Sequence, residues 1–121
     1  MLKKENRLNH KSAFDATYRN KNVVSDDLII LYAGKQKTDQ NCPTRVGFVV
    51  SKKVHKRAVK RNRIKRLMRE NVRLLFLSDS EILNKYQSLI FYAKQEALDK
   101  DFNQIKQSVE TNLLKLANKN I

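Results

Sequence analysis

The sequence predicts an α+β fold, a two-layer α/β sandwich that forms one domain over residues 1–121. Three observations lead to this expectation. Segments with helical periodicity and segments rich in β-branched residues occupy separate stretches, in the order helix, strands, helix, strand, helix. The 121 residues suffice for one modest hydrophobic core and not for two. Apolar residues make up 40% of the chain, and with only two glycines and one proline, long flexible linkers are not expected.

The first element expected along the chain is a short helix over residues 10–19. Phe14 and Tyr18 are four residues apart, so they share one face of that helix. The polar segment 20–22 ends it. Three runs rich in apolar and β-branched residues are expected to form strands: residues 23–24, 28–33 and 45–50. The polar segment 34–44, which contains the only proline, is expected to be a loop.

The second half of the chain predicts two longer helices that flank one strand. The main helix is expected over residues 58–77, where apolar side chains recur at helical spacing: Ile64, Leu67, Met68, Val72 and Leu75. The run 87–93 is typical of a strand. Residues 101–118 predict a final amphipathic helix, and Asp99 or Asp101 is placed to cap its start.

Charge is strongly unbalanced and concentrated in one segment. The chain has 26 Lys and Arg against 12 Asp and Glu, which gives a net charge of +14. Residues 52–73 alone hold eleven of the basic side chains and a single acid, Glu70. Such a segment repels itself unless a polyanion neutralises it. Nucleic acid is the commonest partner of this kind, and an anionic membrane surface is the second.

The charge in this segment is also directional. At about 100° per residue, four polar side chains fall opposite the apolar stripe of the main helix: Asn62, Arg66, Arg69 and Arg73. The planar guanidinium of arginine suits bidentate phosphate contacts. A basic amphipathic helix can also lie on a membrane, but a core this small needs the apolar stripe. A merely solvated face would carry far less charge, so nucleic-acid binding is the favoured interpretation.

The start of the main helix is expected to bind phosphate. Residues 54–60 contain no Ser, Thr, Asp or Asn that could cap its free N–H groups. Four cations precede it instead: Lys52, Lys53, Lys56 and Arg57. A bound phosphate would satisfy both the N–H groups and the cations.

Several other kinds of site and location are not expected. Cys42 is the only cysteine, and His10 and His55 are far apart in sequence, so we expect no disulfide and no metal or other cofactor on the protein. The N-terminus lacks the apolar core of a signal peptide, and the longest apolar run, 28–33, is too short to cross a bilayer. We therefore expect a cytoplasmic protein that does not bind membranes.

The acidic residues do not suggest a free-standing nuclease, which would need converging carboxylates or an acid–base pair. Asp26 and Asp27 adjoin in a turn-like stretch, where neighbouring side chains do not converge. Glu70 is expected to pair with a nearby arginine. The sequence thus predicts no catalytic residue, and composition alone leaves open a ribosomal or other structural RNA-binding protein.

Two runs in the middle of the chain resemble the signature of the bacterial ribonuclease P protein family. The first is Arg-Val-Gly-Phe-Val-Val-Ser-Lys-Lys over residues 45–53, and the second is Ala-Val-Lys-Arg-Asn-Arg-Ile-Lys-Arg-Leu-Met-Arg-Glu over residues 58–70. Weaker similarity extends over nearly the whole chain: Arg7, Leu8, Phe14, Tyr18, Leu31, Tyr32 and the final helix. The resemblance favours a ribonucleoprotein subunit over a ribosomal protein. It also implies a left-handed strand–helix–strand crossover, which is rare.

The function that the resemblance implies is removal of the 5′ leader from precursor tRNA by phosphodiester hydrolysis. In that family the catalytic centre and its magnesium ions belong to a large RNA subunit, and no other protein is an obligate partner. By resemblance, nine residues would contact RNA: Lys52, Lys53, Arg57, Arg61, Asn62, Arg63, Lys65, Arg66 and Arg69. Four aromatic residues would line the cleft that holds the leader: Phe14, Tyr18, Tyr32 and Phe48.

The chain departs from the family after the first helix, and its aromatic residues have a second explanation. The family often has glycine there, where this chain has Asn-Lys-Asn over residues 20–22, although asparagine tolerates a left-handed backbone. Without the resemblance, three phenylalanines are better explained as core: Phe14, Phe48 and Phe91. Tyr18 and Tyr32 fit an RNA-binding surface better, because their hydroxyls can face water while the rings stack on bases.

Overall fold

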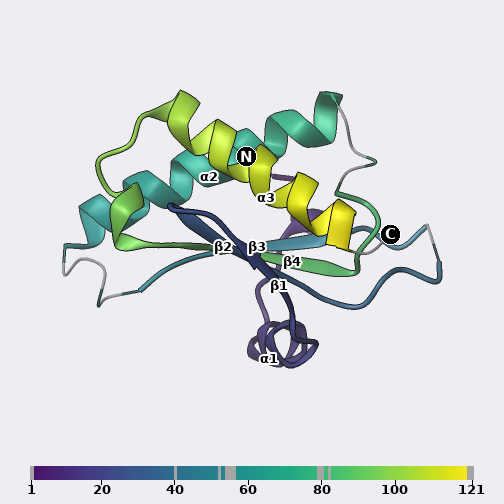
Figure 1. The fold of residues 1–121 in the computed structure, drawn as a ribbon. Coiled ribbons are helices and arrows are strands. Elements are labelled where there is room, and N and C mark those ends of the chain that lie inside the picture. Colours follow the sequence, from purple (N-terminus) through teal and green to yellow (C-terminus); the bar gives the residue numbers. More distant parts are fainter. Residues whose placement is uncertain are drawn as a thin grey trace.

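A computed structural model of the chain describes residues 2–39, 41–51, 53, 57–78, 81 and 83–119. Its elements are, in order, η1 (Lys4–Asn6), α1 (Lys11–Arg19), β1 (Asn22–Ser25), β2 (Ile29–Ala33), β3 (Arg45–Val50), α2 (Ala58–Ser78), β4 (Ser88–Ala93), η3 (Gln95–Ala97) and α3 (Phe102–Lys119) (Figure 1). Every predicted helix and strand is confirmed, with ends that differ by at most one residue.

The four strands form one sheet in the order β1-β2-β4-β3. The β1–β2 and β2–β4 pairs are antiparallel, whereas β3 and β4 are parallel. Parallel neighbours need a crossover connection, and α2 supplies it. The left-handedness that the family resemblance implies for this crossover stays a prediction.

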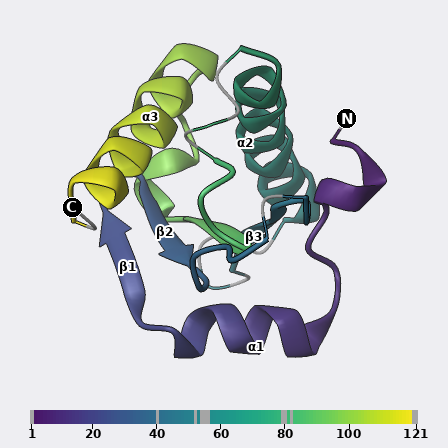
Figure 2. The same cartoon turned by 90° about the vertical axis from the view of Figure 1, so that its right-hand side faces the viewer.

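The helices lie on both faces of the sheet. In Figures 1 and 2, α2 and α3 lie side by side on one face, and α1 lies on the other. The hydrophobic core fills the space between the sheet and the α2–α3 layer, where Leu31, Met68, Phe91 and Leu113 are at most 1% exposed. The predicted two-layer sandwich is therefore present, and α1 adds a shorter third layer.

The apolar stripe of α2 faces the core as its spacing predicts. Ile64, Met68 and Val72 are fully buried, and Leu67 and Leu75 are partly buried against the same cluster. Because these side chains occupy one side of the helix, its arginine-rich side is left facing outward.

The turn after α1 uses a lysine where the family often has glycine. Lys21 has φ 56° and, of the described residues other than glycine, it alone has a positive φ. Its N–H donates to the carbonyl of Tyr18 (3.3 Å), and the preceding Asn20 Nδ2 donates to the Ala33 carbonyl (3.2 Å). The left-handed residue is thus the lysine between the two asparagines.

The start of α3 is capped by Asp101, one of the two predicted candidates. Its Oδ1 accepts the N–H of Gln104 (2.9 Å), and Gln104 Oε1 accepts the N–H of Asp101 (3.1 Å). This reciprocal pair is a capping box, which satisfies two N–H groups at the helix start.

Candidate RNA-binding surfaces

The outer side of α2 forms the first surface. Asn62 and Arg66 are exposed, and Lys65 and Arg69 are partly exposed. All four lie away from the buried stripe of Ile64 and its neighbours, as their spacing predicts. The predicted basic face is therefore present on this helix.

Arg69 also contacts an aromatic ring of the sheet. Its guanidinium carbon lies 5.9 Å from the ring centroid of Phe48, within cation–π range. Phe48 in turn stacks on the core residue Phe91, with centroids 5.9 Å apart and planes at 16°. Phe48 therefore points to the α2 side of the sheet.

Arg63, one of the predicted RNA contacts, makes hydrogen bonds within the protein. Its guanidinium donates to the carbonyls of Leu98 (3.1 Å) and Lys100 (3.0 Å), which lie between η3 and α3. These bonds tie α2 to the segment that leads into α3. Two guanidinium nitrogens of Arg63, a residue predicted to contact RNA, thus donate hydrogen bonds within the protein.

The residues before and within the first turn of α2 are only partly described. Lys53 and Arg57 are exposed and Arg61 is partly exposed. Lys52 lies outside the described residues, and so do residues 54–56, with which the predicted phosphate site at the helix start would be formed. That site stays a prediction.

A cluster of three tyrosines forms the second surface, on the sheet face that carries α1. Tyr18 and Tyr32 have centroids 4.7 Å apart with planes at 81°, and Tyr32 and Tyr92 have centroids 6.5 Å apart with planes at 73°. Each ring is partly exposed. Burial raises the pKa of the Tyr18 phenol above its usual 10.0, and the nearby phenols of Tyr32 and Tyr92, with Asp15, raise it further. At neutral pH this hydroxyl is therefore protonated and able to donate a hydrogen bond.

Phe14 lies at the edge of the sheet beside β3. A Cβ atom at Gly47 would come within 2.6 Å of its ring, so the ring needs glycine beneath it. Phe14, Phe48, Lys65 and Arg69 all line one hollow of about 320 Å³. This hollow brings residues of α1 and of the basic face of α2 to the same edge.

The four predicted cleft aromatics therefore do not share one face. Tyr32 pairs with Ile90 in the sheet, whereas Phe48 pairs with Phe91. Because successive side chains alternate between faces, Phe48 lies on the face opposite Tyr32. The sheet thus separates Phe48 from the tyrosines, and its assignment to the leader cleft stays a prediction. Tyr92, which the sequence did not single out, lies beside Tyr32 on the face that carries α1.

Glu70 and Asp26 have structural roles. Glu70 forms an ion pair with Arg73 (2.6 Å), as predicted, and Asp26 accepts hydrogen bonds in the turn before β2. Within the described ranges, no group of three or more His, Cys, Asp or Glu is placed to hold a metal ion. In that same part of the chain, no helix is long and apolar enough to cross a membrane.

Comparison with known proteins decides the family. The family model described as Ribonuclease P matches residues 2–117. The chain belongs to the ribonuclease P protein family. The ribonuclease P protein component of Clostridium novyi (strain NT) is 40% identical over 116 residues, which cover 96% of each chain. That of Symbiobacterium thermophilum is 38% identical over 109 residues, 90% of this chain and 89% of the relative.

Solved ribonuclease P protein structures have the same fold. The Staphylococcus aureus protein matches with a TM-score of 0.74 and 34% identity, over 94% of this chain and 96% of its own. The Thermotoga maritima protein, at 20% identity, shows the fold alone, with a TM-score of 0.70 over 88% and 94% of the two chains. Members of this family are the protein component of an endoribonuclease ribonucleoprotein that matures tRNA 5′ ends. Their partner in that ribonucleoprotein is ribonuclease P RNA.

Proposed function

We propose that this chain binds ribonuclease P RNA through the outer face of α2 and holds the 5′ leader of precursor tRNA against the tyrosine cluster. The observation that carries the proposal is the cluster itself. Tyr18, Tyr32 and Tyr92 leave their rings partly exposed on a sheet face that α1 only partly covers. Large aromatic rings in such a place are suited to contact a partner rather than a core.

The α2 face suits the phosphates of a folded RNA. Arg66 and Arg69 are one turn apart on the outer side of the helix, beside Asn62 and Lys65. Arginine forks contact phosphate oxygens in pairs, and such contacts position an RNA without reading its sequence. Arg63 is left out of this set because its guanidinium is bonded to two backbone carbonyls.

The tyrosine cluster suits a single strand. Stacking of a base on an aromatic ring tolerates any sequence, because every base has a flat face. A 5′ leader varies in sequence between precursor tRNAs, so a stacking surface matches it better than a hydrogen-bonding pocket would. The hollow at the β3 edge, which Phe14 shares with Arg69, gives the strand a route between the two surfaces.

The remaining parts of the proposal concern chemistry and location. We assign the magnesium ions to the RNA subunit, as in the family, and give the protein no cofactor, catalytic residue or obligate protein partner. We place the protein in the cytoplasm, where precursor tRNA is processed in bacteria.

The test compares precursor tRNA with mature tRNA, each bound to the holoenzyme assembled with its RNA subunit. Tyr32→Ala is expected to cost about 1–3 kcal/mol of affinity for precursor tRNA, since one stacking ring is lost. Affinity for mature tRNA, which has no leader, is expected to stay the same. Equal losses for both RNAs would contradict the assignment of the leader to this cluster.

A second measurement tests the division of labour. Cleavage of precursor tRNA is expected only when the RNA subunit is present. Cleavage by the purified protein alone would overturn the assignment of catalysis to the RNA.

A further inference from the structure

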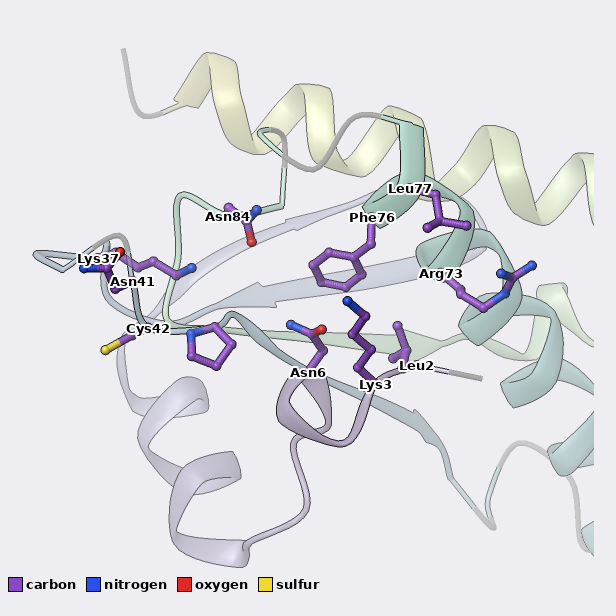
Figure 3. A pocket seen from close by; sticks show the side chains of 11 residues that line it. Leu2, Lys3, Asn6, Lys37, Asn41, Cys42, Arg73, Phe76, Leu77 and Asn84 are labelled. Atoms are coloured by element: carbon purple, nitrogen blue, oxygen red, sulfur yellow. The ribbon is translucent and has the colours of Figure 1, made fainter.

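A separate hollow of about 450 Å³ lies where the N-terminal segment, the loop after β2 and the last turns of α2 meet (Figure 3). Its size is within the ~300–1,000 Å³ range of small-molecule sites. It shares no residue with the tyrosine cluster or with the hollow at the β3 edge except Leu2. It is therefore distinct from the surface assigned to the leader.

One wall of this hollow is apolar and aromatic. Phe76 projects from α2 toward Lys3 and Asn6 of the N-terminal segment in Figure 3, and Leu2 lies beside them. Phe76 also packs against the hydrophobic core, and its ring is only partly buried. A partly exposed ring fixed at its base offers a surface on which a flat base can stack.

Two side-chain amides also line the hollow. Asn6 Nδ2 donates to the carbonyl of Thr44 (2.8 Å), which fixes this side chain within the hollow. The Asn84 amide is directed toward the same space in Figure 3, and within the described part of the chain it makes no hydrogen bond. An amide supplies two donors and an acceptor, the groups that pair with the edge of a base.

The charges in the hollow are positive. Lys3 and Lys37 line it from two different segments, and none of the described residues that line it carries a carboxylate. Burial lowers the pKa of the Lys37 ammonium from its usual 10.5, and the nearby Cys42 only partly offsets this. An anion bound beside Lys37 would offset the cost of burying its charge. Arg73 also lines the hollow but is already paired with Glu70.

We propose that this hollow binds one nucleotide of single-stranded RNA, with the base against Phe76 and Asn84 and the phosphate beside Lys3 and Lys37. Arg73 connects the hollow to the basic face of α2, because it lies four residues after Arg69 on the same side of the helix. An RNA strand on that face can thus place an unstacked nucleotide here. The inference goes beyond leader binding and does not depend on it.

The experiment is an NMR titration of the full-length, ¹⁵N-labelled protein with uridine and adenosine monophosphates. The side-chain amide signals of Asn6 and Asn84 report on the hollow directly. They are expected to shift saturably with either nucleotide. Lys37→Gln and Phe76→Leu are each expected to weaken this binding about tenfold, through loss of a charged contact and of a stacking ring.

Two controls keep the result interpretable. Lys106→Gln removes the same charge from an exposed position on α3 that lines none of the described hollows, and its titration is expected to match that of the wild type. Tyr32→Ala is expected to leave these signals and their titration unchanged. A failure of leader binding is thus distinguishable from a failure of this site.

Three outcomes would overturn the inference: no shift of the two amide signals, an equal response in Lys37→Gln and the wild type, or equally tight binding of inorganic phosphate alone. The last outcome would mean that the base makes no contribution. Lys37 is partly exposed and lies outside the hydrophobic core, so its substitution tests the site even where Phe76→Leu disturbs the fold.

Discussion

The ring of Tyr18 meets the ring of Tyr32 edge-on, with centroids 4.7 Å apart and planes at 81°. Tyr18 comes from α1 and Tyr32 from β2, so this contact also fixes α1 on the sheet. Edge-to-face pairs contribute about 0.5–1.5 kcal/mol beyond the area they bury. Substitution of Tyr18 therefore changes stability as well as the surface, and Tyr92 offers a cleaner test of the surface.

Tyr92→Ala is expected to weaken binding of precursor tRNA by about 1–3 kcal/mol, because the third ring of the cluster is lost. Tyr92→Phe keeps the ring and is expected to retain most of the affinity. The measurement is equilibrium binding of precursor and mature tRNA to the holoenzyme. A loss shared by both RNAs, or by Tyr92→Phe, would exclude base stacking at this position.

Substitutions of Arg63 and Arg66 are expected to have different effects, although the two residues are three apart in one basic helix. Arg63→Lys loses hydrogen bonds to the carbonyls of Leu98 and Lys100, and is expected to lower the free energy of unfolding by about 1–2 kcal/mol. Arg66→Ala is expected to change it by less than about 0.5 kcal/mol, because Arg66 is exposed.

Binding to ribonuclease P RNA at several salt concentrations separates the two roles further. Arg66→Ala is expected to reduce the salt slope by about 0.7–0.9, the value for one phosphate contact. Arg63→Lys is expected to leave the slope unchanged. An unaltered slope for Arg66→Ala would place the interface elsewhere.

Local patterns in the sequence determine the elements and the basic face. The Ile64, Met68 and Val72 spacing correctly gives the buried side of α2, and the exposure of Asn62 and Arg66 follows from it. The Asp101 cap and the Glu70 ion pair are also local, within three residues. Interactions at such short separations are decided by helical geometry, so sequence reasoning reaches them.

Contacts between distant segments could not be predicted in this way. The place of Tyr92 depends on the register of β2 with β4, which pairs Ile30 with Tyr92 and brings Tyr32 close to it. Arg63 finds its carbonyl partners 35 and 37 residues along the chain. The face on which Phe48 lies, by contrast, could be predicted from the sequence. Side chains alternate along a strand, so those of Val46, Phe48 and Val50 lie on the same face.

Lys21→Gly is expected to stabilise the fold by about 0.5–1 kcal/mol. Lys21 has φ 56°, a left-handed conformation that costs a residue with a Cβ atom about 1–2 kcal/mol, and glycine avoids this cost. Part of the gain is offset by the greater entropy of glycine in the unfolded chain. Denaturant unfolding measures the difference. Lys35→Gly, in an exposed loop with an ordinary backbone, is the matched control and is expected to destabilise.

Asp26 joins the turn before β2 to α3. Its Oδ1 accepts hydrogen bonds from the N–H groups of Leu28 (3.0 Å) and Ile29 (2.9 Å) and from the hydroxyl of Ser108 (2.8 Å). Burial by itself would raise the pKa of this carboxyl, but the hydrogen bonds from Ile29, Ser108 and Leu28 outweigh it and hold the pKa below its usual 3.8.

The low pKa makes the contribution of Asp26 to stability depend on pH. Since the folded protein releases this proton more readily than the unfolded chain, the stabilisation is present above the unfolded pKa of 3.8 and is lost as pH falls through the folded-state value. Asp26→Asn is therefore expected to lower the free energy of unfolding at pH 6 by about 1 kcal/mol, a modest value because the carboxyl is partly solvated. The difference from wild type is expected to shrink as pH falls below 3.8.

Asp27→Asn separates this local effect from overall charge. The chain carries +14, so removing any carboxylate adds to its self-repulsion. Asp27 is exposed and adjacent, and its substitution changes the net charge by the same amount. Urea unfolding of both variants, measured from pH 6 down to pH values below the usual 3.8 of an Asp carboxyl, gives the comparison. If the two variants lose equal stability at pH 6, the hydrogen bonds to Oδ1 contribute nothing beyond charge balance.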